Sequence, residues 1–423
     1  MNKTFTVAIL GFGNRGQVYA KLMAQKEECF KIVAVCDTNP IQLEHVGGLY
    51  NLEKSNLFSD TNEFLKEKRA DVLVISTWDK DHVEQCLTAM DLGYDVLLEK
   101  PISDSKEEIK LLMDKQRETG RKVVVCHVMR YSPAILLLDE VVKSGVLGRL
   151  MAIDHTERVA YWHYVQAYIK MHSAWQGKTY ATILAKCCHD LDLIQHYASS
   201  KCKSVASIGK IGCFTKENAP TGASEYCLDC VHVETCPYSA KRVYLDKWKE
   251  QNCPEYAWPF YRVAPKKPIT EEAILDGLRT TVYGKCAYLL EVDKDKSVAD
   301  HQMVQMQFEN GVVANLNMVF SATSGRRIVL YGEKGEAVLD QRNDSIEIYS
   351  YGALKEVRKI SEYGYTKGGH GGGDRGIVNK FYDILCGTCT EYTSLEESLE
   401  SHLIGIAAEE SRLNSGKAVP VHS

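Results

Sequence analysis

Polar side chains gather in one short and otherwise apolar segment near the middle of the chain. Residues 183–194 (ILAKCCHDLDLI) have the apolar spacing of a helix, in which Lys186, His189 and Asp192 share an arc of about 120°. A histidine with an ordinary pKa of about 6.5 suits proton transfer near neutral pH. We therefore predict that His189 is a general base. Lys186 and Asp192 are predicted to complete the catalytic group, with Asp192 fixing a substrate hydroxyl or orienting the imidazole.

A glycine-rich turn near the N-terminus indicates a nucleotide site. The turn matches G-x-G-x-x-G, lies between a strand pattern and a helix pattern, and reads Gly11-Phe12-Gly13-Asn14-Arg15-Gly16. Such a turn brings a pyrophosphate to the helix N-terminus, and Arg15 is placed to add a charged contact. Asp37 follows 21 residues after Gly16, where an acid binds ribose hydroxyls. No arginine follows it in Thr38-Asn39-Pro40, so we expect NAD rather than NADP.

A lysine stands at the end of another expected strand. Asp95–Glu99 has an apolar interior and is followed by Lys100-Pro101, where the proline disfavours helix at the lysine. Ligands of open α/β sheets bind outside the carboxyl ends of the strands. Lys100 is therefore predicted to reach the reacting substrate atom and to stabilise negative charge on it.

These residues need a scaffold, and residues 1–128 have the pattern of an NAD-binding Rossmann domain. Short apolar strand patterns alternate there with amphipathic helix patterns, which predicts a doubly wound parallel sheet. The expected strands are Thr6–Leu10, Lys31–Cys36, Asp71–Ser76, Asp95–Glu99 and Lys122–His127, and the expected helices are Gln17–Lys26, His82–Leu92 and Lys106–Thr119.

The alternation stops after Arg130. A helix pattern from Pro133 is followed by longer strand patterns at Met151–Val159, Val304–Phe308, Val312–Phe320 and Arg327–Leu330. This order predicts a C-terminal α+β domain over residues 129–423, with a large and mostly antiparallel open sheet. A cysteine-rich insertion is expected at about 213–268.

Composition excludes several classes of protein. Of the 423 residues, 45% are hydrophobic and 25% are charged, which is typical of globular chains. A net charge of −5 lacks the basic footprint of a nucleic-acid binder. The sequence shows neither an apolar run long enough to span a bilayer nor a signal-peptide pattern. We therefore expect a cytoplasmic protein with neither nucleic-acid nor membrane partners.

Together these motifs resemble the Gfo/Idh/MocA family of nicotinamide-dependent oxidoreductases. Besides the glycine turn and Asp37, the resemblance rests on Thr77-Trp78-Asp79-Lys80-Asp81-His82, Glu99-Lys100-Pro101, Arg130-Tyr131-Ser132-Pro133 and His189-Asp190-Leu191-Asp192. It implies a sugar, cyclitol or sugar derivative as substrate, and a homodimer or homotetramer. The further cofactor contacts that it implies are Thr38, Thr77, Trp78, His82, Glu99, Lys100 and Arg130.

The chain departs from the family pattern at two places. Trp78-Asp79 stands where the family usually has Pro-Asn, so Trp78 is expected to stack on the cofactor. Ala185 stands four residues before His189, where the family has an aspartate. The usual Asp–His pair is therefore missing, and we expect Lys186 and His189 to replace it.

Aromatic and histidine side chains near the expected catalytic helix are candidates for substrate binding. Aromatic faces beside polar groups suit sugar rings, although core packing explains the same residues equally well. The candidates are Tyr161, Trp162, His163 and Trp175, with His127 at the end of the fifth strand and His370 in the glycine-rich loop 368–374.

Fifteen cysteines in a chain without a signal-peptide pattern favour reduced thiols or metal ligands over disulfides. Cys227, Cys230 and Cys236 form C-x2-C-x5-C, which predicts a structural Zn²⁺ site, while an iron–sulfur cluster would use the same ligands. Cys253 or Cys286 is the fourth ligand. Family members with such an insertion also carry a Tyr-Gly-x-Cys element, which favours Cys286.

The leading hypothesis is therefore an NAD-dependent oxidoreductase that takes hydride from a secondary alcohol. An alternative is redox-neutral glycosidic or lyase-type cleavage, in which tightly bound NAD is reduced only transiently. A non-catalytic NAD-binding regulator is the third hypothesis, and Lys100 and His189 argue against it.

Overall fold

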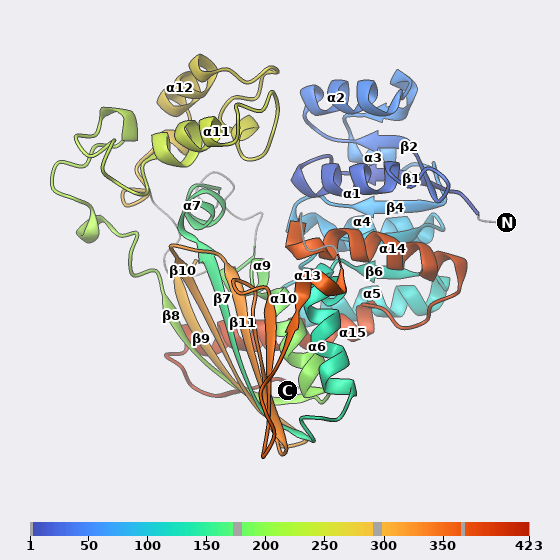
Figure 1. Cartoon of the computed structure of the whole chain (residues 1–423). Coiled ribbons are helices and arrows are strands. Elements are labelled where there is room, and N and C mark those ends of the chain that lie inside the picture. The colour runs from blue at the N-terminus through green and yellow to red at the C-terminus, as the bar shows by residue number, and fades with distance from the viewer. Residues whose placement is uncertain (1–2, 172–179, 291–297, 365–368, 423) are drawn as a thin grey trace.

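The computed structural model describes residues 3–171, 180–290, 298–364 and 369–422. Its N-terminal sheet has six parallel strands in the order β3-β2-β1-β4-β5-β6 (Figure 1). The strands are β1 (Phe5–Leu10), β2 (Phe30–Cys36), β3 (Leu57–Phe58), β4 (Val72–Ile75), β5 (Asp95–Leu98) and β6 (Val123–Val125). The helices are α1 (Asn14–Ala24), α2 (Pro40–Tyr50), α3 (Thr61–Phe64), α4 (His82–Asp91) and α5 (Lys106–Thr119). The predicted Rossmann fold is confirmed, and its five predicted strands agree within two residues at each end.

The C-terminal sheet has nine strands in the order β14-β13-β12-β11-β7-β10-β9-β8-β15. Among the described strands of this sheet only β7 and β10 pair in parallel, which confirms a mostly antiparallel sheet. The strands are β7 (Leu150–Ala160), β8 (Cys202–Lys210), β9 (His301–Phe308), β10 (Val313–Ser321), β11 (Gly325–Gly332), β12 (Gly335–Asp340), β13 (Ser345–Ser350), β14 (Glu356–Lys359) and β15 (Val419–Pro420). Helices α6 (Pro133–Lys143), α7 (Tyr161–Tyr164), α9 (Thr182–Ala185), α10 (Cys188–Ala198) and α13 (Ile360–Tyr363) belong to this part of the chain.

The end of the chain returns to the N-terminal sheet. Helix α14 (Gly373–Cys386) lies across that sheet in Figure 1, and its Ile377, Val378 and Phe381 share a buried core with β1 and β2. Thr393 exchanges hydrogen bonds with Val125 of β6 before helix α15 (Leu395–Leu413) begins. The last fifty residues therefore complete the cover of the nucleotide-binding sheet.

The segment between β8 and β9 forms the insertion. It holds α11 (Lys247–Glu250), α12 (Glu271–Thr280) and several single-turn helices, and it is longer than the expected range 213–268. In Figure 1 it lies beyond α7 and close to α2, at the top of the molecule. None of the helices in the described ranges is both long enough and apolar enough to cross a membrane.

Candidate active site

The turn after β1 leaves room for a ligand against its backbone. Gly11 has φ +88°, and a Cβ there would lie 2.6 Å from the Ser76 carbonyl oxygen, so a side chain is excluded. A Cβ on Gly16 would lie 2.1 Å from the Gly11 carbonyl oxygen, whereas one on Gly13 would meet no atom within 4 Å. No side chain caps helix α1 where it begins at Asn14. The N–H groups of its first turn therefore fit a pyrophosphate.

Asp37 braces this turn. Its carboxylate accepts hydrogen bonds from the backbone N–H groups of Phe12 (2.6 Å) and Asn39 (2.8 Å). Burial raises the pKa of Asp37, against the lowering by these two bonds and by Arg262. A carboxylate has about four lone-pair positions, so acceptor capacity remains for ribose hydroxyls. Thr38 is exposed beside it, whereas the Phe12 side chain is buried.

Arg15 connects the turn to two carboxylates. Its Nε lies 2.6 Å from Glu99 Oε1 and its Nη2 lies 2.8 Å from Asp374 Oδ1. Its guanidinium also stacks on the Tyr19 ring, 4.7 Å from the centroid. Arg15 and Glu99 therefore form a buried charged support under the cofactor turn.

The other cofactor candidates lie at the ends of β4 and β5. Thr77 donates a hydrogen bond to Gln85 (2.6 Å), and His82 Nδ1 lies 2.8 Å from the Pro101 carbonyl oxygen. Trp78 precedes the short helix Asp79–Asp81. These contacts hold the two strand ends together at the carboxyl edge of the sheet.

Lys100 points from this edge toward the second domain. Its Nζ donates a hydrogen bond to the Ala185 carbonyl oxygen at 2.8 Å. Burial lowers the pKa of Lys100, but Cys188, Glu99 and Asp79 raise it by more, so the ammonium form is maintained. Lys100 therefore brings a positive charge to the segment that carries His189.

His189 is a buried, neutral imidazole. It is 3% exposed, and neither ring nitrogen has a hydrogen-bond partner among the described residues. Burial, Lys100 and neighbouring His370 hold its pKa well below the ordinary value. Its ring centroid lies 5.3 Å from that of His370 and 6.1 Å from that of His127. Both ring nitrogens are therefore open to a bound molecule, but the lowered pKa makes His189 a weaker base than its ordinary pKa of about 6.5 predicts.

His370 brings a carboxylate partner to this cluster. Its Nδ1 lies 2.9 Å from Asp374 Oδ1, and Asp374 is also paired with Arg15. His370 and Arg15 lower the pKa of Asp374 despite its burial. An Asp–His pair therefore exists at the site, but it comes from the glycine-rich loop and the start of α14.

The prediction of one helix over residues 183–194 is wrong. Helix α9 ends at Ala185 and α10 begins at Cys188, with Lys186 and Cys187 at the break. Lys186 Nζ pairs with Glu157 Oε1 of β7 at 2.7 Å. The break places Asp190 in the first turn of α10, where a carboxylate is favoured by the helix dipole.

Behind the break lies a network of buried charges. Asp190 accepts from Arg326 Nε and lies against His155 Nε2, both at 2.8 Å, and Arg326 also lies 3.2 Å from Glu157. This network fixes both the start of α10 and the position of Lys186.

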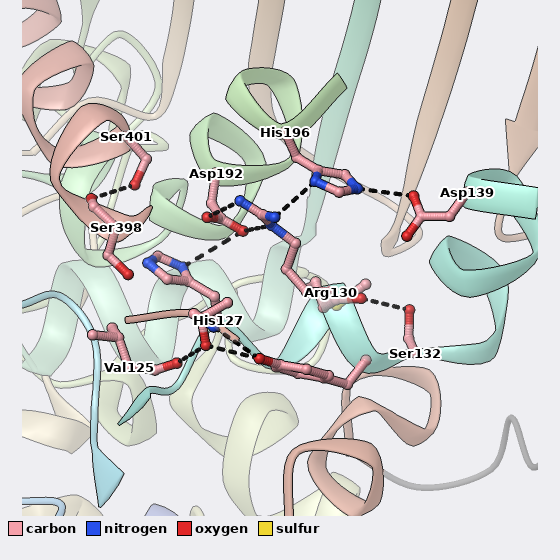
Figure 2. A network of polar contacts seen from close by, with 12 residues as sticks. Val125, His127, Arg130, Ser132, Asp139, Asp192, His196, Ser398 and Ser401 are labelled. Carbon is pink, nitrogen blue, oxygen red and sulfur yellow. Dashed lines mark hydrogen bonds and ion pairs between the residues drawn. The ribbon is translucent and has the colours of Figure 1, made fainter. Parts of the chain in front are cut away.

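Asp192 pairs with Arg130 rather than with His189. Figure 2 shows Arg130 between Asp192 and His196, with contacts of 2.7 and 2.9 Å to the carboxylate and 2.7 Å to His196 Nδ1. His127 Nδ1 lies 3.9 Å from Asp192 Oδ2. Arg130, expected at the cofactor, thus connects the end of the first domain to α10.

An aromatic group stands over the cluster. Trp162 and His163 of α7 stack at 5.5 Å, and both rings lie against Trp258 of the insertion. Burial, Lys186 and His370 lower the pKa of His163 to about 3. Tyr161 packs on Tyr238 at 6.2 Å. Trp175 lies outside the described residues.

The four predicted metal ligands come together around one cavity. Cys227, Cys230, Cys236 and Cys286 line a space of about 20 Å³, whereas Cys253 is exposed and does not line it. Among the described side chains, however, no group of three or more His, Cys, Asp or Glu is arranged so that it could hold a metal ion. The thiols are thus gathered, but they do not form a ready metal site.

Two contributors to the site, Asp374 and Arg262, were not among the predicted residues. Asp374 lies four residues after His370, a spacing that could indicate a contact along a helix. The contact forms differently, because His370 has a left-handed backbone conformation (φ 52°) and precedes the helix. Arg262 approaches Trp78 and Asp37 from the insertion. No sequence pattern indicates that approach.

Comparisons with known proteins agree with this geometry. Two models of one oxidoreductase family match the chain: an NAD-binding Rossmann fold over residues 5–127 and a C-terminal alpha/beta domain over residues 275–421. YteT of Bacillus subtilis, which is named as an oxidoreductase, is 20% identical over 351 residues, 77% of each chain. The scyllo-inositol 2-dehydrogenase (NAD(+)) of the same species is 30% identical over 145 residues, 34% of this chain and 41% of that protein. Levoglucosan dehydrogenase, solved with NADH and levoglucosan, shares the fold along the whole of both chains with a TM-score of 0.71 and 16% identity.

Proposed function

Since the chain belongs to the Gfo/Idh/MocA family of NAD-binding oxidoreductases, we propose that it oxidises a secondary alcohol of a sugar, cyclitol or sugar derivative. The observation that carries this proposal is the buried His189 near the ammonium group of Lys100, since neither of its ring nitrogens has a hydrogen-bond partner in the part of the chain that the structure describes. His189 is placed to accept the hydroxyl proton, and the Lys100 cation, although it lowers the pKa of the imidazole, favours the alkoxide that forms. Bound NAD supplies the hydride acceptor.

The residues then have separate tasks. His189 takes the hydroxyl proton, and Lys100 stabilises the negative charge that develops on the oxygen. His370, oriented by Asp374 at 2.9 Å, is the second acid–base group and lies beside His189. Lys186 and Asp192 position the segment through Glu157 and Arg130.

The substrate class follows from the wall of the site and from the relatives. Trp162 and Trp258 offer ring faces, and His163 beside them is a neutral polar group. Named relatives act on inositols, and a structural neighbour binds levoglucosan, so polyhydroxylated rings fit this class.

A panel of sugars, cyclitols and glycosides, assayed for NADH absorbance and for product, tests the proposal. Net NADH formation that is lost in Lys100→Met supports it. Product from a glycoside without net NADH would replace it by redox-neutral cleavage, and NAD binding without any product would indicate a regulator.

We further propose that the cavity of four cysteines takes one Zn²⁺. Lys170 supports this proposal, because its buried Nζ donates to the carbonyl oxygens of Tyr283 (2.8 Å) and Lys285 (2.5 Å). Burial lowers the pKa of Lys170, and three of the four cysteines lie near enough to oppose that lowering. A zinc–thiolate centre would supply the negative charge that balances this cation.

Metal analysis of protein purified without chelators should find about one zinc per chain. Cys230→Ser should lose the metal, whereas Cys253→Ser, in the same insertion but outside the cavity, should keep it. Zinc near zero in the wild type, or equal zinc in both variants, would reject the site.

The open sheet suggests a homo-oligomer. The side chains of Ile208, Met303, Val313 and Tyr331 are exposed on one face of β8, β9, β10 and β11. Burial of such a face favours association of two copies. Light scattering should give a dimer or tetramer, and a monomer at working concentrations would contradict this proposal.

A further inference from the structure

The insertion reaches back to the N-terminal domain at two places. Lys267 Nζ lies 3.3 Å from His45 Nδ1 of α2, and the Tyr256 ring packs on the same histidine at 5.5 Å. At the end of β4, the Arg262 guanidinium lies 5.6 Å from the centroid of the Trp78 ring. Residues 253–268 therefore extend from α2 to the strand end that carries Trp78.

These two places flank the nucleotide turn. Strands β2, β1 and β4 are neighbours in the sheet, so Asp37, the turn at Gly11–Gly16 and Trp78 follow one another along its carboxyl edge. Asp37 marks the ribose position in this fold. This part of the insertion thus stands over the adenosine half of the dinucleotide site.

Three buried polar atoms of this segment have no hydrogen-bond partner among the described residues, and one of them is the Tyr261 hydroxyl. The other two are Arg262 Nε and the Tyr256 hydroxyl. Tyr256 is held by a parallel stack on Tyr261, with centroids 5.1 Å apart. Buried donors are normally satisfied, and leaving one unpaired is costly. A ligand with acceptor oxygens at this place would satisfy Arg262 and Tyr256.

We propose that residues 253–268 form the outer wall of the adenosine site and that Arg262 binds the ribose–phosphate part of the dinucleotide there. This inference rests on the NAD site of the proposed function and names a contact that the Rossmann domain does not supply. The charge of Arg262 also acts on Asp37. A basic residue is therefore present beside Asp37, and Asp37 alone excludes the 2′-phosphate of NADP.

Binding measurements by calorimetry on the full chain test the first part. Arg262→Gln should bind NAD and ADP-ribose roughly ten- to a hundredfold more weakly, the range expected for a lost charge-assisted contact. Nicotinamide mononucleotide should bind as in the wild type. Arg279→Gln is the matched control, because Arg279 is an exposed arginine on α12 of the same insertion.

A second pair of variants keeps the test decisive if Arg262→Gln loosens the insertion. Asp37→Ala should gain NADP binding by tenfold or more, since Arg262 is then free to pair with the 2′-phosphate. Asp37→Ala with Arg262→Gln should lose that gain. An equal gain with and without Arg262, or unchanged NAD and ADP-ribose binding in Arg262→Gln, would overturn the inference. Absence of NAD binding in the wild type would instead refute the proposed function.

Discussion

Replacing Asp374 by asparagine removes one negative charge from the contact between the glycine-rich loop and the cofactor-binding helix. In the wild type this carboxylate accepts from Arg15 Nη2 (2.8 Å) and Nη1 (3.2 Å) and holds His370 Nδ1 (2.9 Å). Asparagine has the same shape but one acceptor oxygen and one donor group. It can satisfy either Arg15 or His370 as an acceptor, but its amide N–H₂ then faces the other.

The structural cost of this change is modest. Arg15 keeps Glu99 at 2.6 Å, so its buried charge remains paired, and the loss resembles that of a charged hydrogen bond, about 1–3 kcal/mol. Removing the only partner of a buried charge would cost more, about 3–5 kcal/mol. The catalytic cost should be larger. His370 loses the acceptor that fixes its tautomer, and acid–base groups contribute roughly 10²–10⁴-fold to turnover.

Steady-state kinetics and thermal unfolding of Asp374→Asn measure both costs. The pH profile separates catalysis from structure: Asp374 raises the pKa of His370 against burial, so its loss should move the acidic limb of kcat/KM to lower pH. Asp383→Asn, an exposed position on the same helix α14, is the control. Turnover within fivefold of wild type (about 1 kcal/mol), or additive losses in Asp374→Asn with His370→Ala, would refute the coupling.

Three further predictions concern the residues around this pair. Lys100→Met and His189→Ala should each lower turnover roughly 10²–10⁴-fold while NAD binding survives, and wild-type turnover in either variant would remove that residue from the mechanism. Lys186→Ala should raise the pKa of His163 from its low value of about 3, because Lys186 lowers it; an unchanged histidine titration by NMR would contradict the contact. Arg326→Met should destabilise the protein by about 3–5 kcal/mol at pH 7, because Asp190 and Glu157 lose their shared cation. Arg326 depresses the pKa of Asp190, so this stability is present above about pH 4 and disappears as pH falls through the folded-state pKa; thermal unfolding of both proteins should therefore converge on acidification.

The N-terminal fold was predictable because its determinants are local. Strands such as Val72–Ile75 are apolar on both faces, and the turn at Gly11–Gly16 excludes side chains at two of its glycines. The strand order of the C-terminal sheet was harder to predict. A pattern of strands along the sequence does not indicate which strands become neighbours, and so it does not predict that β10 pairs in parallel with β7.

The site was predictable only in part. Lys100 and His189 follow from local motifs, and the structure places them together. Lys186 shows why the other residues of the site could not be predicted. Helical spacing places it beside His189, but the helix is interrupted at Lys186, and its side chain pairs with Glu157 of β7 at 2.7 Å. Arg262 approaches Asp37 only after the insertion has folded across the molecule, which is a tertiary effect that no residue spacing records.

The return of the C-terminal helices has a consequence for biosynthesis. The face of the nucleotide-binding sheet that α14 covers includes Phe5, Phe30 and Val35, and Phe381 of α14 packs into the same buried cluster. A ribosome releases α14 long after β1 and β2, so part of this apolar surface stays uncovered until α14 has been made. Nascent chains should therefore depend on chaperones during that interval. A premature stop before residue 373 should send the whole chain to degradation instead of yielding a free nucleotide-binding domain.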